Sequence, residues 1–171
     1  MTIGYQSVNV FFCVFASAAR TPGKVALTED ARSLTYGRLA ERIERIANVA
    51  SAGLGLRSGD HAALMSPNCI EFLEIVCGLA LAGIATAMVN PRLTSGEAAY
   101  ICNDSQARVL FVHSSLEDLA RAMPLESVER IIVIGGEYED WLLKAQPGTG
   151  SLAPVVETDT FCIPYTAGTT G

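Results

Sequence analysis

From about residue 60 onward, short apolar runs alternate with longer amphipathic segments. The short runs are apolar at nearly every position. They therefore indicate strands that are buried on both faces, as in a parallel sheet, better than strands with one solvated face. The strands expected from this pattern are His61–Met65, Ile84–Val89, Arg108–Val112, Arg130–Ile134 and Thr160–Pro164.

Helix signals separate these expected strands. Thr94 and Ser114 each stand three residues before a glutamate (Glu97 and Glu117), which is the spacing of a capping box at the start of a helix. The segment Cys69–Gly83 is apolar at helical spacing and ends at a glycine. We expect one helix in each of these three places.

A further amphipathic helix is expected upstream of the first strand, from near Thr35 to near Gly53. Its apolar residues recur at steps of four and three, at Leu39, Ile43, Ile46 and Ala50. On the opposite face Glu41 and Arg45 stand four residues apart, and we interpret this pair as a solvated contact without function.

The N-terminal segment Val8–Ala19 is apolar and ends in small residues, as a secretory signal does. However, no Lys or Arg precedes it, and it is shorter than the roughly 20 apolar residues that cross a bilayer. We expect a helix packed on the core, with a targeting segment as the alternative. No integral membrane segment is expected.

Alternating strands and helices predict an α/β fold, with a mainly parallel sheet and helices on both of its faces. The sequence has no internal repeat and no long linker, so residues 1–171 are expected to form a single domain. The stretch Gln146–Thr158 contains Gly, Pro and Ser and is expected to be the loop before the last strand.

Composition narrows the classes of function. Half of the 171 residues are hydrophobic and the mean hydropathy is +0.32, which indicates either strands that are buried on both faces or a surface that another segment or a partner covers. Twelve basic and 18 acidic residues give a net charge of −6, and without a Lys/Arg cluster no nucleic-acid partner is expected. The five cysteines form no C-x-x-C pair, which argues against a metal site and favours reduced thiols in a cytoplasmic protein.

The usual catalytic motifs are absent from the sequence, including the nucleophile elbow and H-E-x-x-H. Asp60 follows a glycine and is expected to cap the entry to a strand. His61 and His113 stand at the edges of apolar runs, where a hydrogen-bonded, partly buried histidine is the expected role. We therefore assign no catalytic residue within this chain.

The last seven residues, "YTAGTTG" (Tyr165–Gly171), follow an expected strand and combine threonines with glycines. Hydroxyls and closely approaching backbone N–H groups in such a loop can hold phosphate oxygens. It is not a Walker A loop, because no G-K-[ST] follows. From composition alone, a flexible terminus remains the alternative.

This loop resembles the start of the AMP-binding signature of the adenylate-forming enzymes. That family comprises acyl-CoA synthetases, luciferases and the adenylation domains of peptide synthetases. The resemblance extends upstream through several family-like phrases in the same order. They are "AARTPGKVAL", "LTYGRLAERIERIA", "GLRSGDHAALMSPNCIEF", "LAGIATAMVNPRLTSGEAAYICNDSQARVLFV" and "IIVIGG".

The resemblance implies the first part of the large N-terminal domain of an acyl-CoA synthetase. Such an enzyme uses ATP with Mg²⁺ to join a carboxylic acid to AMP, and then transfers the acyl group to coenzyme A. Ala167 stands where the family usually has Ser. The residues that match the phosphate-contacting, cofactor-binding loop are Thr166, Ala167, Gly168, Thr169, Thr170 and Gly171.

The family signature continues into a Pro-Lys-Gly stretch that lies past Gly171. We therefore expect an incomplete domain, truncated within the phosphate loop, that is inactive alone, binds no cofactor tightly and self-associates. For the parent enzyme we expect a cytoplasmic ligase of the kind found in fatty acid metabolism. Fatty and aryl acids are not distinguished by these residues.

Two hypotheses remain at this point. The first is the N-terminal fragment of an ATP-dependent carboxylate–CoA ligase, and Thr169 favours acyl-CoA synthetases over peptide-synthetase adenylation domains. The second is a stand-alone, non-enzymatic α/β module that binds a nucleotide or a partner.

Overall fold

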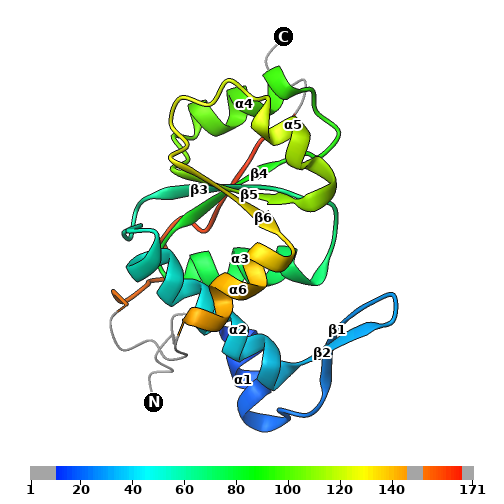
Figure 1. The fold of residues 1–171 in the computed structure, drawn as a ribbon. Helices are drawn as coiled ribbons and strands as arrows, with labels where there is room; N and C mark the ends of the chain where they lie inside the picture. Colours follow the sequence, from blue (N-terminus) through cyan, green and yellow to red (C-terminus); the bar gives the residue numbers. More distant parts are fainter. Residues whose placement is uncertain (1–10, 146–151, 167–171) are drawn as a thin grey trace.

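Five parallel strands form the centre of the structure, in the spatial order β6-β5-β3-β4-β7 (Figure 1). This computed structural model describes residues 11–145 and 152–166. The elements in chain order are α1 (Phe12–Arg20), β1 (Val25–Glu29), β2 (Arg32–Thr35), α2 (Tyr36–Asn48), η1 (Val49–Gly53), β3 (His61–Met65), α3 (Ile70–Leu81), β4 (Ala85–Val89), α4 (Ser95–Asp104), β5 (Val109–His113), η2 (Ser114–Leu116), α5 (Glu117–Arg121), β6 (Arg130–Ile134), α6 (Gly136–Lys144) and β7 (Cys162–Pro164).

Both faces of the sheet are buried, which explains why its strands are apolar at almost every position. Leu64 and Phe111 point to one face, where α2, α3 and α6 supply the opposing side chains. Their neighbours Met65 and Val112 point to the other face, toward α4 and α5. Figure 1 shows these two helical layers on opposite sides of the sheet. The predicted α/β fold with a parallel sheet between helices is confirmed.

The strand order explains which helix covers which face. The chain moves from β3 to its neighbour β4 through α3, and then returns across β3 to β5 through α4. Crossovers between parallel strands have a fixed hand, so a reversal of direction moves the connecting helix to the opposite face. Accordingly α4 and α5 lie on one side of the sheet, and α3 and α6 on the other (Figure 1).

The expected helix starts at Thr94 and Thr35 are confirmed in detail. The Thr94 side chain accepts from the backbone N–H of Glu97, and the Glu97 side chain accepts from the backbone N–H of Thr94, which completes the capping box of α4. Thr35 caps α2 by accepting from the backbone N–H of Arg38.

The expected capping box at Ser114 is wrong. Ser114 lies inside the short 3-10 turn η2, and α5 begins only at Glu117. The His113 imidazole accepts the backbone N–H of Ser115 at 3.2 Å. Because this ring takes the cap position, the Ser114 hydroxyl is not used to start a helix.

The N-terminal region packs beneath α2 and α3. Helix α1 begins at Phe12, and its Val14 lies in a small apolar cluster with Leu39, Ile43 and Cys77. This confirms the expected packed helix for the part of Val8–Ala19 that the structure describes. None of the helices in residues 11–145 and 152–166 has the length and hydrophobicity that a membrane crossing requires. The antiparallel pair β1–β2, which follows α1, was not predicted.

The Glu41–Arg45 pair is not simply a solvated surface contact. Arg45 donates to Glu41 at 3.0 Å and also to the backbone carbonyls of Leu142 and Ala145. These carbonyls belong to the C-terminal end of α6, where helices leave acceptors unsatisfied. Arg45 therefore fastens α6 to α2, which corrects the interpretation made from the i, i+4 spacing alone.

Helices α2 and α3 approach each other most closely at Gly78. A Cβ atom at this position would lie 2.5 Å from side-chain atoms of Ile46 and 3.1 Å from the carbonyl oxygen of Ile43. The glycine is thus required for the contact between these two helices, because neither a backbone carbonyl nor a buried β-branched side chain can move aside easily.

We expect Gly78→Ala to lower the free energy of unfolding by about 1–3 kcal/mol, because the added methyl group overpacks this contact. Urea unfolding followed by circular dichroism measures the change. Gly96→Ala in α4 is the matched control, since a Cβ there meets no atom within 4 Å. The control should be neutral or stabilising by up to about 1 kcal/mol. Equal effects of the two substitutions would contradict the proposed close approach.

Candidate functional site

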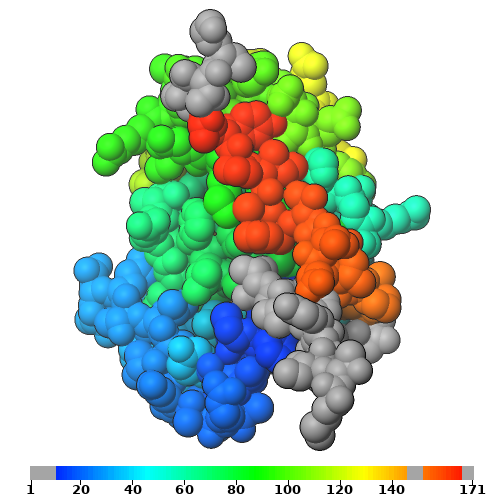
Figure 2. Space-filling view, turned by 180° about the vertical axis from the view of Figure 1, so that it is seen from behind, coloured from blue at the N-terminus to red at the C-terminus, as the bar shows by residue number. Residues whose placement is uncertain are grey.

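The candidate site lies where β4 and β7 end. β7 pairs in parallel with β4, with Met88 opposite Pro164, so the chain that leaves β7 emerges beside the chain that leaves β4. In open α/β sheets, ligands bind outside the carboxyl ends of the strands. Figure 2 shows the C-terminal segment, in orange and red, running across one face of the molecule to the green residues of α4.

Tyr165 fixes the chain directly after β7. Its hydroxyl donates to Oδ2 of Asp104, the last residue of α4, at a distance of 2.7 Å. Its ring packs against the apolar cluster that α4 and α5 form with the sheet. Burial and the hydrogen bond to Asp104 raise the pKa of Tyr165 to about 12, so the phenol stays protonated and remains a donor at neutral pH.

Thr166 is exposed at the mouth of a cavity of about 440 Å³. The cavity lies between α4 and the ends of β4 and β7, and its lining residues are Met88, Asn90, Leu93, Gly96, Glu97, Tyr100, Ile101, Tyr165 and Thr166. Thr166 is the one residue of the expected phosphate loop within the described part of the chain. The other five, Ala167, Gly168, Thr169, Thr170 and Gly171, lie outside the described residues.

Comparison with known proteins gives a match to the AMP-binding enzyme family over residues 14–171. The chain belongs to this family. Among curated relatives, it is 31% identical to a fatty acid–[acyl-carrier-protein] ligase of Streptomyces coeruleorubidus, over 90% of this chain and 30% of that protein. It is 30% identical to a 4-hydroxybenzoate–CoA/benzoate–CoA ligase of Rhodopseudomonas palustris, over 87% of this chain and 29% of that protein.

Solved structures of AMP-binding enzymes share the fold. An anthranilate–CoA ligase, AuaEII, matches with a TM-score of 0.88 and 28% identity, over 96% of this chain and 32% of its own. The N-terminal domain of FACL13 from Mycobacterium tuberculosis matches with a TM-score of 0.83 and 28% identity, over 97% of this chain and 42% of its own. The chain spans about 30% of the length of the curated relatives described above.

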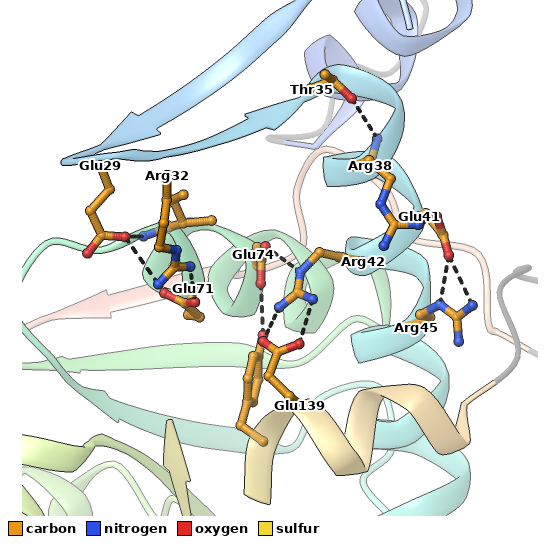
Figure 3. Close-up of polar contacts among 12 residues, drawn as sticks. Glu29, Arg32, Thr35, Arg38, Glu41, Arg42, Arg45, Glu71, Glu74 and Glu139 are labelled. Atoms are coloured by element: carbon orange, nitrogen blue, oxygen red, sulfur yellow. Dashed lines mark hydrogen bonds and ion pairs between the residues drawn. The ribbon is translucent and has the colours of Figure 1, made fainter. Parts of the chain in front are cut away.

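A second, larger cavity of about 590 Å³ lies at the opposite end of the row of strands. It opens where β5 and β6 end, at His113 and Gly135, and the hairpin β1–β2 closes its other side. Glu29 on this hairpin accepts the backbone N–H of Ile70 at the start of α3, and Arg32 pairs with Glu71 one residue further (Figure 3).

Arg42 lines this second cavity and joins three elements around it. Its Nε donates to Glu74 at 2.6 Å, and its two terminal nitrogens donate to Glu139 at 2.6 and 2.9 Å (Figure 3). Tyr138 donates to the other oxygen of Glu74 at 3.1 Å. Burial raises the pKa of Glu74, while the hydrogen bond from Arg42 lowers the pKa of Glu139.

These charged groups are satisfied by one another. The guanidinium groups of Arg32 and Arg42 both pair with carboxylates. The N-termini of α3 and α6, at Ile70 and Gly136, also lie beside glutamate side chains, which a helix N-terminus stabilises. The cavity is therefore best explained as a structural junction of α2, α3, α6 and the hairpin. Two glutamates inside the otherwise apolar α3, Glu71 and Glu74, were the signal in the sequence that could have revealed it.

The other residues considered from the sequence make hydrogen bonds and ion pairs within the chain. Asp60 accepts the backbone N–H of Arg57 at 2.8 Å and pairs with Arg108 at 2.7 Å, which confirms a structural role at the strand entry. The His61 ring nitrogen Nδ1 bonds the Ser105 carbonyl at 2.7 Å. His113 bonds the Ser115 hydroxyl at 2.8 Å.

The cysteines are free thiols, and their burial varies. Cys77 and Cys102 are buried, and burial raises their pKa values to about 11 and about 12, which makes them unreactive. Cys69 and Cys162 are partly buried, whereas Cys13 is exposed. Within residues 11–145 and 152–166, no three His, Cys, Asp or Glu side chains are grouped so that they could hold a metal ion.

We expect Arg42→Ala to lower the free energy of unfolding by about 3–5 kcal/mol, because it leaves Glu74 buried without its cation. Arg38→Ala on the same helix is the matched control. The Arg38 side chain is 62% exposed, against 15% for Arg42, so its pair with Glu41 should contribute less than about 1 kcal/mol. Urea denaturation measures both variants, and a loss as small as that of the control would contradict a buried junction.

We expect Tyr165 to ionise near pH 12, above the ordinary tyrosine value of about 10. Because its folded pKa is raised, its contribution to stability is complete below about pH 10 and is lost as the pH rises toward 12. Phenolate absorbance during an alkaline titration measures this, with Tyr165→Phe identifying the signal. Asp104→Ala should lower the pKa. An unchanged titration in that variant would exclude the hydrogen bond.

Proposed function

We propose that this chain is the N-terminal part of an ATP-dependent carboxylate–CoA ligase. The observation that carries the proposal is the family match over residues 14–171, which includes the Thr/Gly-rich segment at the carboxyl end of β7. Such a ligase joins a carboxylic acid to AMP with release of pyrophosphate, and then transfers the acyl group to the thiol of coenzyme A.

In this proposal the segment Thr166–Gly171 holds the phosphates of ATP. Phosphoryl chemistry depends mainly on positioning and on neutralising developing charge, which hydroxyl and backbone N–H donors can do. Thr166, Thr169 and Thr170 supply hydroxyls, and the glycines allow the backbone to approach the phosphate oxygens. Ala167 keeps its backbone N–H, so the exchange of Ser for Ala costs this loop one hydroxyl donor.

The chemistry named for the relatives supports an organic acid as the substrate. Their names include a fatty acid, benzoates, crotonobetaine and carnitine as the acids, and CoA in most cases as the acceptor. Mg²⁺ belongs to the proposal as the counter-ion of ATP. We propose a cytoplasmic enzyme, for which the free cysteines give support.

For the 171-residue chain alone we propose an incomplete domain that is inactive and binds ATP and CoA weakly. The relatives are about three times longer, so two thirds of their sequence has no counterpart in this chain. β7 is the outermost strand of the described sheet, and Val156 and Phe161 near it are 51% and 40% exposed. Uncovered apolar surface of this kind supports self-association of the chain.

The test is ATP–pyrophosphate exchange by the protein expressed from its whole reading frame, including any codons that follow Gly171. We expect exchange that depends on a carboxylic acid, because adenylation is reversible. A panel of fatty, aryl and amino acids identifies the substrate class, and hydroxylamine trapping of the acyl group gives an independent readout. Absence of exchange with every acid would overturn the ligase proposal.

The 171-residue chain serves as the control for the same experiment. We expect no exchange from it, and calorimetry should give weak ATP binding, because the segments that would enclose the nucleotide are missing. Low-micromolar ATP binding by this short chain would contradict its proposed incompleteness. It would support instead a stand-alone nucleotide-binding module.

A further inference from the structure

The hydrogen bond between Tyr165 and Asp104 joins two parts of the chain that are 61 residues apart. One partner belongs to the connection between β7 and the proposed phosphate loop, and the other ends α4. β7 pairs with β4 through only three residue pairs, so the ladder alone gives a short anchor for the chain that follows. The hydrogen bond of Tyr165 adds a further anchor point, one residue past the end of the ladder and directly before Thr166.

Helix α4 is held at both ends and is therefore a rigid support for Asp104. Its N-terminus carries the reciprocal capping box of Thr94 and Glu97. Near its C-terminus the Asn103 side chain donates to the Pro124 carbonyl at 3.0 Å and accepts the backbone N–H of Glu126 at 2.9 Å. Asp104 thus has a fixed position relative to the sheet.

The position of Asp104 is unfavourable for helix stability. A carboxylate at the C-terminus of a helix lies at the negative end of the helix dipole, where a cation would be preferred. Residues that are unfavourable for local stability are expected at functional sites. The compensating contact is the charge-assisted hydrogen bond from the Tyr165 hydroxyl, at 2.7 Å.

From this geometry we propose that Asp104 and Tyr165 are positioning residues that hold the entry to the phosphate loop at the carboxyl end of β7. The proposal rests on the function proposed above, in which Thr166–Gly171 binds ATP. The hydroxyl of Tyr165 is occupied by Asp104, so it acts on the nucleotide only through the placement of Thr166. The proposal therefore predicts that loss of the pair changes the use of ATP.

Three variants of the whole-reading-frame protein test this role. Tyr165→Phe removes the hydroxyl and keeps the ring in its apolar cluster, Asp104→Ala removes the acceptor, and Asp104→Asn keeps a neutral acceptor. We expect the first two to raise the KM for ATP in the exchange assay roughly tenfold, the loss associated with one charge-assisted hydrogen bond. The KM for the acid should stay unchanged. Asp104→Asn should raise the KM for ATP less than Asp104→Ala does.

Asp118→Asn is the matched control, because Asp118 is an exposed aspartate on α5 in the same layer of helices. Its KM for ATP should stay within about twofold of the parent value. The double variant Tyr165→Phe/Asp104→Ala should be no worse than the poorer single variant, since both remove the same contact. Lower thermal stability with an unchanged KM for ATP would show a purely structural contact and would overturn the proposal.

A second readout separates failure of this proposal from failure of the ligase function. In the 171-residue chain, the backbone amide of Thr166 is observed by NMR, without any substrate. We expect Tyr165→Phe and Asp104→Ala to shift its resonance and to speed its exchange with solvent, whereas Asp118→Asn should do neither. An unaltered Thr166 amide overturns the positioning role, whether or not the longer protein has ligase activity.

Discussion

The ion pairs of Arg42 are the contact on which the arrangement of the helices depends. This one guanidinium binds Glu74 of α3 and Glu139 of α6 from its place on α2, so three helices that are distant in sequence share a single charged centre (Figure 3). Glu74 is fully buried, and a buried carboxylate without a cation is strongly unfavourable. The packing of α2 against the layer formed by α3 and α6 is therefore specified by charge as well as by apolar contact.

The ion pairs of Arg42 also make the cavity at the β5–β6 end different in charge from the cavity at the β4–β7 end. At the β5–β6 end, Arg32 and Arg42 are already paired with carboxylates, and the hairpin β1–β2 closes the cavity. At the β4–β7 end, the chain leaves the sheet beside a cavity in which few charged groups are present, with Thr166 exposed at its mouth. At this second end the backbone and hydroxyl of Thr166 directly follow a strand terminus, an arrangement that suits a phosphate group.

Most of the fold follows from the sequence, because burial on both faces leaves a clear signal. The expected strands His61–Met65 and Arg130–Ile134 match the observed strands at both ends. Contacts between distant segments leave no comparable local signal. The spacing of Glu41 and Arg45 shows that they can pair on a helix, but not that Arg45 also reaches the carbonyls of α6. The hairpin was missed for a similar reason, since its short strands are only partly buried.

The sequence indicated the candidate site through the threonines and glycines of its loop. The structure adds the contacts that hold the start of this loop in place. The threonines and glycines after β7 indicate what such a loop can bind, but a loop binds tightly only if its ends are fixed in advance. The short ladder to β4 ends at Pro164, and packing of the ring and the bond to Asp104 then hold Tyr165, one residue before Thr166. Asp104 carried no functional signal in the sequence, because its partner is 61 residues away. The residues that position this loop are therefore recognised only when the fold brings the end of α4 beside the end of β7.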